Sequence, residues 1–255
     1  MKNEYLPEVV RITAIEDVAR DVRKFTLGTA LACRPGQFVQ LTLFGIGEAP
    51  ISVSSAPGEE LELSVKKVGS LTTALHRFGV GDRVGVRGPY GTGYPEFGEG
   101  ERVVLVAGGI GLAPLRSFIR ANLGKCEMQL FYGARTSADL AFKEEYGEWQ
   151  KKGMEIYKVI GAKEEGWDGP VGNPIEILGP VWPGASALMC GPPVMINFAL
   201  KKLEEKGIPR NRVYVSMERL MRCGIGKCGH CMVDGTYVCR NGPVFRADSM
   251  PAEAP

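Results

Sequence analysis

The sequence predicts a small all-β barrel, then an α/β domain built on a doubly wound parallel sheet, and finally a small cysteine-rich segment. Up to about residue 98, short segments rich in β-branched residues are separated by turn signals. From about residue 99, strand patterns alternate with helix patterns. Four of the seven cysteines lie after residue 222. We therefore place three domains at residues 1–98, 99–215 and 216–255.

Composition limits the class of protein. The 255 residues are 44% hydrophobic and 24% charged, which is enough for about two domains with buried cores. With Lys+Arg 31 against Asp+Glu 29, the net charge of +2 favours neither a nucleic acid nor an anionic membrane as partner. The sequence shows no secretory signal and no apolar run long enough to span a bilayer, so we expect a cytoplasmic protein. The odd number of cysteines and their clustering favour reduced thiols and a metal site over disulfides.

The predicted barrel rests on segments such as 9–15, 38–44 and 61–68. Each is short, β-branched and followed by a turn containing Gly, Pro or Asp. Segments of this kind at close spacing are typical of an antiparallel unit that closes on itself.

The predicted α/β domain follows from a longer period. Buried strands and amphipathic helices alternate, which is the pattern of a parallel sheet covered by helices on both faces. The strands are expected at 102–109, 127–134, 155–162, 186–191 and 212–218, and the helices at 113–123, 138–153 and 192–207.

The stretch LVAGGIGLAP (105–114) carries the strongest phosphate signal. Gly108, Gly109 and Gly111 form a turn between a strand and a helix, where bare backbone can approach a pyrophosphate at the helix N-terminus. The spacing differs from the usual G-x-G-x-x-G of dinucleotide folds. A turn that only packs a strand against a helix is therefore the alternative.

The stretch MCGPPVM (189–195) supports a nucleotide site independently. Cys190 and Gly191 end another predicted parallel strand, and ligands of such sheets bind at the carboxyl ends of the strands. Pro192 then opens a helix, a position where proline is tolerated. The alternative for Cys190 is a buried structural cysteine.

Taken in order, six motifs resemble the ferredoxin-NADP reductase superfamily: PGQF (35–38), PISVSSAP (50–57), GSLT (69–72), AGGIGLAP (107–114), YGART (132–136) and MCGPP (189–193). The resemblance implies that the barrel binds FAD and that the α/β domain binds NAD(H) or NADP(H). It implies that Pro50, Ile51, Ser52 and Val53 lie along the flavin, with the Ser52 hydroxyl at the reactive N5 edge. It also implies that Gly69, Ser70, Leu71 and Thr72 hold the flavin pyrophosphate, and that Glu218 lies near the nicotinamide.

From these implications we take Ser52, Cys190 and Glu218 as candidate catalytic residues. The expected nucleotide contacts are Gly108, Gly109, Gly111, Gly191 and Pro192.

Two positions depart from the superfamily pattern. An arginine and an aromatic residue usually accompany the flavin serine, but this chain has Ala49 and Ile51. The flavin contacts must therefore be rebuilt in part, and FMN stays open as the bound flavin. A barrel without any flavin is a further alternative, but it would leave a nicotinamide with nothing to reduce.

The cysteine-rich segment predicts a metal centre. Cys223, Cys228, Cys231 and Cys239 give C-x4-C-x2-C and a fourth cysteine, the spacing of plant-type [2Fe–2S] clusters. Zinc is the alternative, but zinc ribbons usually present two C-x2-C pairs and this segment has one. A Rieske centre needs two histidines, whereas His230 is the single one nearby.

Residues 217–245, together with GEAPISVSS (47–55), are similar to the flavoprotein subunits of anaerobic sulfite reductases and of soluble NAD(P)-linked hydrogenases, the sulfhydrogenase gamma type. The electron-transfer subunit of dihydroorotate dehydrogenase is a more distant likeness. The resemblance implies a subunit of a heteromeric redox complex. It would take hydride from NAD(P)H onto FAD and pass electrons singly through the cluster to a partner enzyme.

Two other functions stay open. One is a self-sufficient NAD(P)H oxidase or flavin reductase whose metal loop is only structural. The other is a scaffolding module, which leaves the nucleotide loops unexplained. The choice between NAD and NADP is also open, with Arg135 and Lys163 as candidate contacts of a 2′-phosphate.

Overall fold

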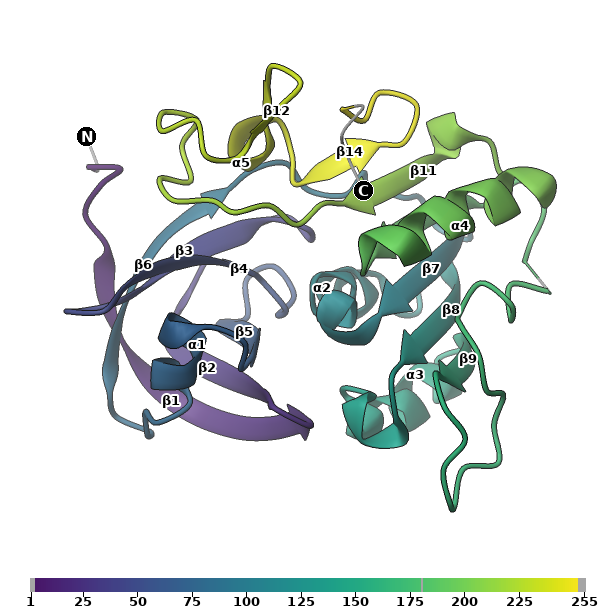
Figure 1. The fold of residues 1–255 in the computed structure, drawn as a ribbon, viewed down its shortest axis with the longest axis horizontal. Helices are drawn as coiled ribbons and strands as arrows, with labels where there is room; N and C mark the ends of the chain where they lie inside the picture. The colour runs from purple at the N-terminus through teal and green to yellow at the C-terminus, as the bar shows by residue number, and fades with distance from the viewer. Residues whose placement is uncertain (1–2, 180, 252–255) are drawn as a thin grey trace.

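The computed structural model describes residues 3–179 and 181–251, so the outermost residues of the first and third predicted domains lie outside the described residues. Figure 1 shows the barrel on one side, the α/β domain on the other and the C-terminal segment across the top of both. The predicted fold class is confirmed. In the described part of the chain, no helix combines the length and the apolar character that a membrane crossing requires.

The barrel is a six-stranded antiparallel sheet with the order β4-β3-β6-β1-β2-β5. Inward-facing Val, Leu, Ile and Phe side chains from these strands fill its core. A short helix, α1 (Ser70–Leu75), covers one end through Leu71 and Leu75. The strands are β1 (Glu8–Ala19), β2 (Val22–Ala30), β3 (Phe38–Leu43), β4 (Gly47–Ser52), β5 (Glu60–Lys66) and β6 (Arg83–Tyr90).

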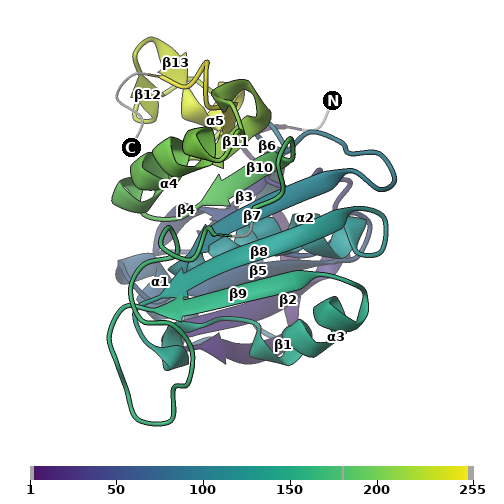
Figure 2. The same cartoon turned by 90° about the vertical axis from the view of Figure 1, so that its right-hand side faces the viewer.

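The α/β domain contains the sheet order β14-β11-β10-β7-β8-β9, in which all neighbours except β14 run parallel. In chain order the parallel strands read 3-2-1-4-5, the doubly wound arrangement with its switch point between β7 and β10. Figure 2 shows this sheet face on. Its elements are β7 (Arg102–Gly108), η1 (Gly109–Gly111), α2 (Leu112–Asn122), β8 (Glu127–Ala134), β9 (Glu155–Ile160), β10 (Ser186–Cys190), α4 (Pro193–Glu205), η4 (Arg210–Arg212) and β11 (Val213–Ser216).

In its described residues, 216–251, the C-terminal segment forms no separate core. Its strand β14 (Val244–Arg246) pairs antiparallel with β11, and Val233, Val238 and Phe245 join the core beneath α4. The segment also contains the hairpin β12 (Met232–Val233) and β13 (Thr236–Tyr237) and the single-turn helix α5 (Val238–Asn241). The cysteine-rich part is therefore held by the α/β sheet.

The predicted helix at 138–153 was wrong over its first half. The chain forms two short 3-10 turns, η2 (Ser137–Asp139) and η3 (Lys143–Glu145), before α3 (Tyr146–Lys151). Leu140, Ala141 and Phe142 are buried, and Phe142 has a left-handed φ of 58°. The Phe142 N–H donates to the Val18 carbonyl of the barrel. Packing against the barrel therefore overrides the local helical preference.

Candidate active site

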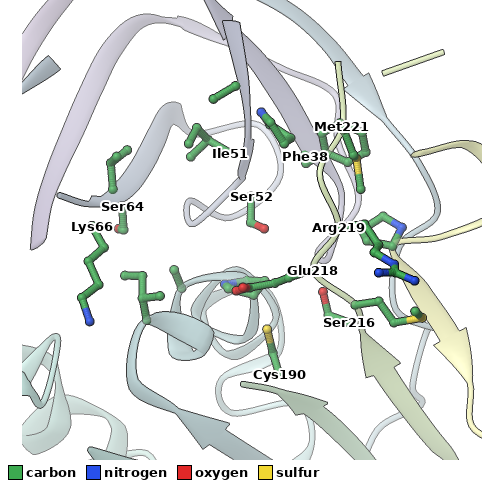
Figure 3. Close-up of a pocket in the computed structure, with 18 of the residues that line it drawn as sticks. Phe38, Ile51, Ser52, Ser64, Lys66, Cys190, Ser216, Glu218, Arg219 and Met221 are labelled. Atoms are coloured by element: carbon green, nitrogen blue, oxygen red, sulfur yellow. The ribbon is translucent and has the colours of Figure 1, made fainter. Parts of the chain in front are cut away.

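A cavity of about 500 Å³ opens where the barrel meets the carboxyl ends of β10 and β11. This volume suits a small-molecule cofactor. Figure 3 shows side chains from the barrel facing side chains from the α/β domain across it. The lining residues are Phe38, Ala49, Pro50, Ile51, Ser52, Ser64, Val65, Lys66, Val68, Thr72, Ile110, Ala113, Pro114, Cys190, Ser216, Met217, Glu218, Arg219, Met221 and Pro243.

Strand β4 forms the barrel wall of this cavity. Pro50, Ile51 and Ser52 line it, and the Ser52 hydroxyl points into the space (Figure 3). Ser52 lies opposite Phe38 in the β3–β4 pairing, and both residues face the cavity. Val53 instead turns away and is fully buried in the barrel core, with its N–H donating to the Gln37 carbonyl.

Cys190 and Glu218 form the opposite wall. Cys190 ends β10 and points its thiol toward the cavity, while the Glu218 carboxylate lies in the same opening (Figure 3). Burial raises the pKa of Cys190 to about 12, with the nearby charge of Glu218 adding to the rise and a bond with Ser216 opposing it. Cys190 therefore presents a neutral thiol at neutral pH. Burial also raises the pKa of Glu218, which remains accessible from the cavity although protein surrounds it.

The 69–72 segment contributes less side-chain contact than its sequence implies. Thr72 lines the cavity, but its hydroxyl already accepts the N–H groups of Val68 and Gly69 at the start of α1. Leu71 is buried in the barrel core, and Ser70 lies outside the lining. Any anion held here would therefore meet backbone N–H groups of the first helical turn.

A second cavity, of about 420 Å³, adjoins the first, because Lys66 and Ile110 line both. The predicted nucleotide residues Gly108, Gly109, Arg135 and Pro192 line it. Gly111 and Gly191 do not. A Cβ on Gly111 would collide with the backbone of Cys190, and one on Gly191 would lie 2.6 Å from Met195 Cε. These two glycines let the turn after β7 pack directly against the turn after β10. Lys163 is exposed and outside both linings.

Sequence reasoning missed the basic residues contributed by the barrel. Lys66, at the end of β5, lines both cavities, and Arg20, in the β1–β2 turn, lines the second. It also missed the loop at 172–175, which covers one side of the second cavity. No local motif marks these residues, and Lys66 and Arg20 reach the site only through the docking of the barrel on the α/β domain.

The four cysteines of the C-terminal segment lie together in two pairs. The Cys228 thiol interacts with the Cys223 side chain, and the Cys239 thiol interacts chiefly with Cys231 and also electrostatically with Cys223. The pKa of Cys228 is lowered to about 7, chiefly by the backbone N–H of His230. The pKa of Cys239 is raised to about 12 by burial and by Cys231.

Backbone amides are aimed at these sulfurs. The N–H groups of Gly226 and Lys227 lie 3.1 Å from Cys239 Sγ and 3.4 Å from Cys223 Sγ. Within the described residues, no three His, Cys, Asp or Glu side chains are grouped as ligands of one ion. Two thiol pairs surrounded by N–H donors fit a centre with two irons, in which each iron takes two cysteines. They fit a single tetrahedral zinc less well.

Two family models match the chain. The model described as the oxidoreductase NAD-binding domain matches residues 105–201, and that of the iron–sulfur cluster binding domain of dihydroorotate dehydrogenase B matches residues 218–250. The first covers both glycine turns of the second cavity, and the second covers all four paired cysteines.

Among curated proteins, the chain is 37% identical to the sulfhydrogenase 2 subunit gamma of Pyrococcus furiosus, over 83% of this chain and 82% of that one. It is also 37% identical to a probable dihydroorotate dehydrogenase B (NAD(+)) electron transfer subunit of Thermococcus kodakarensis, over 95% of this chain and 97% of that one. Among solved structures, that of the NADH-dependent reduced ferredoxin-NADP oxidoreductase superposes with a TM-score of 0.79 at 27% identity. This superposition covers 100% of this chain and 91% of the chain in that structure.

The matched lengths include the barrel, the α/β domain and the cysteine-rich segment in one order. The chain belongs to the family of electron-transfer subunits with the ferredoxin-NADP reductase fold that includes the sulfhydrogenase gamma subunits and the electron transfer subunits of dihydroorotate dehydrogenase B.

Proposed function

We propose that this chain moves electrons between NAD(P)H and a partner redox enzyme, with FAD in the first cavity and a [2Fe–2S] cluster on the four cysteines. One observation carries the proposal. The wall that holds Ser52 faces Cys190 and Glu218 across the first cavity, and the second cavity opens directly beside it. A nicotinamide entering from the second cavity would therefore meet a flavin lying against β4.

The chain's own residues bind and orient the two reactants. Gly108 and Gly109 offer bare backbone to the nucleotide phosphates, and Pro192 lines the same cavity. Lys66 offers a positive charge between the two cavities. This charge would replace in part that of the arginine which the superfamily usually has at the position of Ala49. The neutral Cys190 thiol and the Glu218 carboxyl, which is exposed at the cavity, would face the nicotinamide end. The Ser52 hydroxyl points into the first cavity and would donate a hydrogen bond to a flavin held against β4.

Flavin accepts two electrons with a hydride and releases them singly, and an iron–sulfur cluster carries one electron at a time. The loop at 223–231 is the exit. Cys228 is exposed, whereas Cys231 and Cys239 are buried. Leu220 and Met232, at 67% and 52% exposure, add apolar surface near that exit. We propose that the partner subunit docks over Cys228, and that the partner belongs to the hydrogenase or sulfite reductase class.

A second candidate partner is a dihydroorotate dehydrogenase. Two observations favour it: the iron–sulfur model that matches residues 218–250, and the near-complete mutual coverage with the Thermococcus kodakarensis protein. The two candidates share every step inside this chain and differ only in the final acceptor.

We also propose a cytoplasmic location, which the seven free cysteines support.

Cofactor content and acceptor choice test the proposal. We expect protein purified without oxygen to contain FAD together with two irons and two sulfides per chain. It should reduce a one-electron dye with NADH at a rate that falls when the cluster is lost. Zinc in place of iron, with flavin reduction retained, would contradict the proposal and indicate a flavin reductase with a structural metal. Adding purified hydrogenase, sulfite reductase and dihydroorotate dehydrogenase catalytic subunits in turn then identifies the acceptor class.

A further inference from the structure

Gln40 is a fully buried polar residue whose hydrogen bonds are not made within the protein. It lies on β3 with an exposure of 0%. Among the described residues, neither its Nε2 nor its Oε1 has a hydrogen-bond partner. A buried amide that forms no hydrogen bond destabilises the folded protein, so such groups normally have a partner.

The pairing of the barrel strands places Gln40 between the two proposed cofactors. It lies opposite Pro50 of β4 on one side and opposite Arg87 of β6 on the other. Directly opposite residues of paired strands project to the same face. Pro50 lines the flavin cavity, and Arg87 Nη1 donates to the Cys223 carbonyl at 3.3 Å. The row Pro50–Gln40–Arg87 therefore runs from the flavin cavity to the first cluster cysteine.

The Gln40 side chain packs directly against the cluster loop. Gly224, which follows Cys223, has a φ of 77°, and a Cβ on it would lie 3.0 Å from Gln40 Cγ and 3.2 Å from Gln40 Nε2. Glycine at 224 therefore lets the loop approach this amide as closely as backbone can. A Cβ at this position would also lie 3.0 Å from Tyr90 Cδ2, so Gln40 and Tyr90 together form the floor under the loop.

The other polar groups of this floor are already used. Arg87 forms a two-point ion pair with Glu48, with bonds of 2.9 and 2.7 Å, and also donates to the Glu4 carbonyl. The Tyr90 hydroxyl donates to the same carbonyl at 3.1 Å. Gln40 is thus the remaining donor beneath the loop. Sulfur atoms of an iron–sulfur cluster are electron-rich acceptors that commonly receive N–H groups.

We propose that Gln40 is a positioning residue whose side-chain N–H donates to a sulfur of the cluster and raises the cluster's reduction potential. This inference rests on the proposed cluster. Reduction adds negative charge to the cluster, and a hydrogen-bond donor at sulfur stabilises the added charge. Because neither amide atom has another partner among the described residues, the amide is free to turn its NH2 group toward the sulfur.

The test compares Gln40→Leu and Gln40→Met with the parent protein. Iron and acid-labile sulfide are measured first, so that absence of the cluster, which would refute the proposed function, is separated from failure of this inference. The cluster is then titrated against potential and followed by electron paramagnetic resonance. We expect both variants to have a more negative midpoint potential. At the parent's midpoint, the ratio of reduced to oxidised cluster should fall about tenfold, as loss of one hydrogen bond to a charged acceptor predicts.

Gln129→Met is the matched control. Gln129 is also a buried glutamine, but on β8 of the α/β domain, where its amide donates to Glu155 at 2.7 Å. This variant should lower the melting temperature and leave the cluster potential unchanged. If the Gln40 variants behave the same way, the amide has only a structural role and the proposal is overturned.

A measurement on the unaltered sequence keeps the proposal testable if neither Gln40 variant folds. Protein is prepared with isotopically labelled glutamine, and pulsed electron paramagnetic resonance of the reduced cluster is searched for coupling to a side-chain nitrogen. Coupling to a glutamine nitrogen supports the proposal. A spectrum with backbone couplings alone contradicts it.

Discussion

The guanidinium of Arg116 on α2 lies 2.6 Å from the carboxylate of Glu62 on β5, joining the α/β domain to the barrel. Arg116 is fully buried, and it also donates to the Ser54 carbonyl and to Glu145. The neighbouring Ser117 hydroxyl donates to the Ser55 carbonyl at 2.6 Å. Because the start of α2 lines the first cavity, these bonds fix the wall that faces the barrel.

Replacing Arg116 should destabilise the protein strongly. Arg116→Met leaves the Glu62 carboxylate partly buried without its main partner, and we expect a loss of about 3 kcal/mol in unfolding free energy. The control is Arg102→Met, which breaks the exposed pair with Glu127 and should cost less than about 1 kcal/mol. Chemical denaturation checks both values. Equal losses would show that the buried pair does not hold the domains together.

The same pair gives the protein a dependence on acid. Burial by itself raises the pKa of Glu62, but the charge and hydrogen bonds of Arg116, helped by Lys24, outweigh burial and hold that pKa below its ordinary value. The stabilisation is therefore present above the unfolded pKa of 4.5 and is lost as the pH falls through the lower folded value. In the Glu62→Gln variant, the melting temperature should depend less on pH across this acid range than it does in the parent.

The cluster and the flavin should be separable. Cys228→Ser removes one of the paired thiols, so we expect it to abolish the cluster while NAD(P)H still reduces the flavin at close to the parent rate. Rapid mixing with NADH, followed at the flavin absorbance, measures this. The control is Cys33→Ser, which replaces a buried barrel cysteine away from the loop. Simultaneous loss of flavin reduction in Cys228→Ser would mean that the two sites are not modular.

We expect Gly109 to be required for binding of the nicotinamide nucleotide. It has a φ of 53° and lines the second cavity, and a Cβ there meets no protein atom, so a larger side chain would occupy the space of the ligand. We expect Gly109→Val to raise the KM for NADH at least about tenfold while both bound cofactors remain. Gly207→Val, at a φ of 83° and outside both cavities, controls for backbone strain. An unchanged KM would place the nucleotide elsewhere.

Arg135 should favour NADPH. It follows β8 and lines the second cavity, whereas the exposed Lys163 does not. Arg135→Ala should therefore reduce kcat/KM for NADPH relative to NADH by about tenfold, the value of one charged contact with a phosphate. Lys163→Ala should leave the ratio unchanged. A shift with Lys163 and none with Arg135 would show that the 2′-phosphate contacts Lys163 instead.

We expect the Glu218 carboxyl to lower the stability of the protein and to speed the reduction of the flavin. Because burial raises its pKa, the folded state favours the protonated carboxyl, and the stability cost grows as the pH rises above the ordinary value of 4.5. Glu218→Gln should therefore melt at a higher temperature than the parent, by a margin that is larger at pH 8 than at pH 5. It should also slow flavin reduction by at least about tenfold, if the carboxylate orients the nicotinamide. Calorimetry and rapid mixing separate the two effects.

Periodicity alone predicted the barrel, the parallel sheet and the glycine turns, because hydrophobic patterning and turn chemistry act locally. The first half of the 138–153 helix failed because Phe142 packs against the barrel, which is a tertiary effect. The cysteine spacing anticipated a two-iron site, and the thiols do lie in two pairs.

The sequence could not identify Lys66, Arg20 or Gln40. Lys66 and Arg20 belong to the barrel and reach the second cavity only because α2 docks on β5. Gln40 reads as an ordinary polar residue in a strand. Only its burial, its unpaired amide among the described residues and its contact with Gly224 distinguish it.

An anaerobic titration with NADH, and separately NADPH, tests whether this one chain passes electrons from a hydride donor to a one-electron acceptor. Flavin absorbance and electron paramagnetic resonance are followed on the same samples. We expect flavin bleaching to be accompanied or followed by a [2Fe–2S] signal, seen during the titration or after added dithionite. Reducible flavin with bound zinc and no iron signal under dithionite would contradict it.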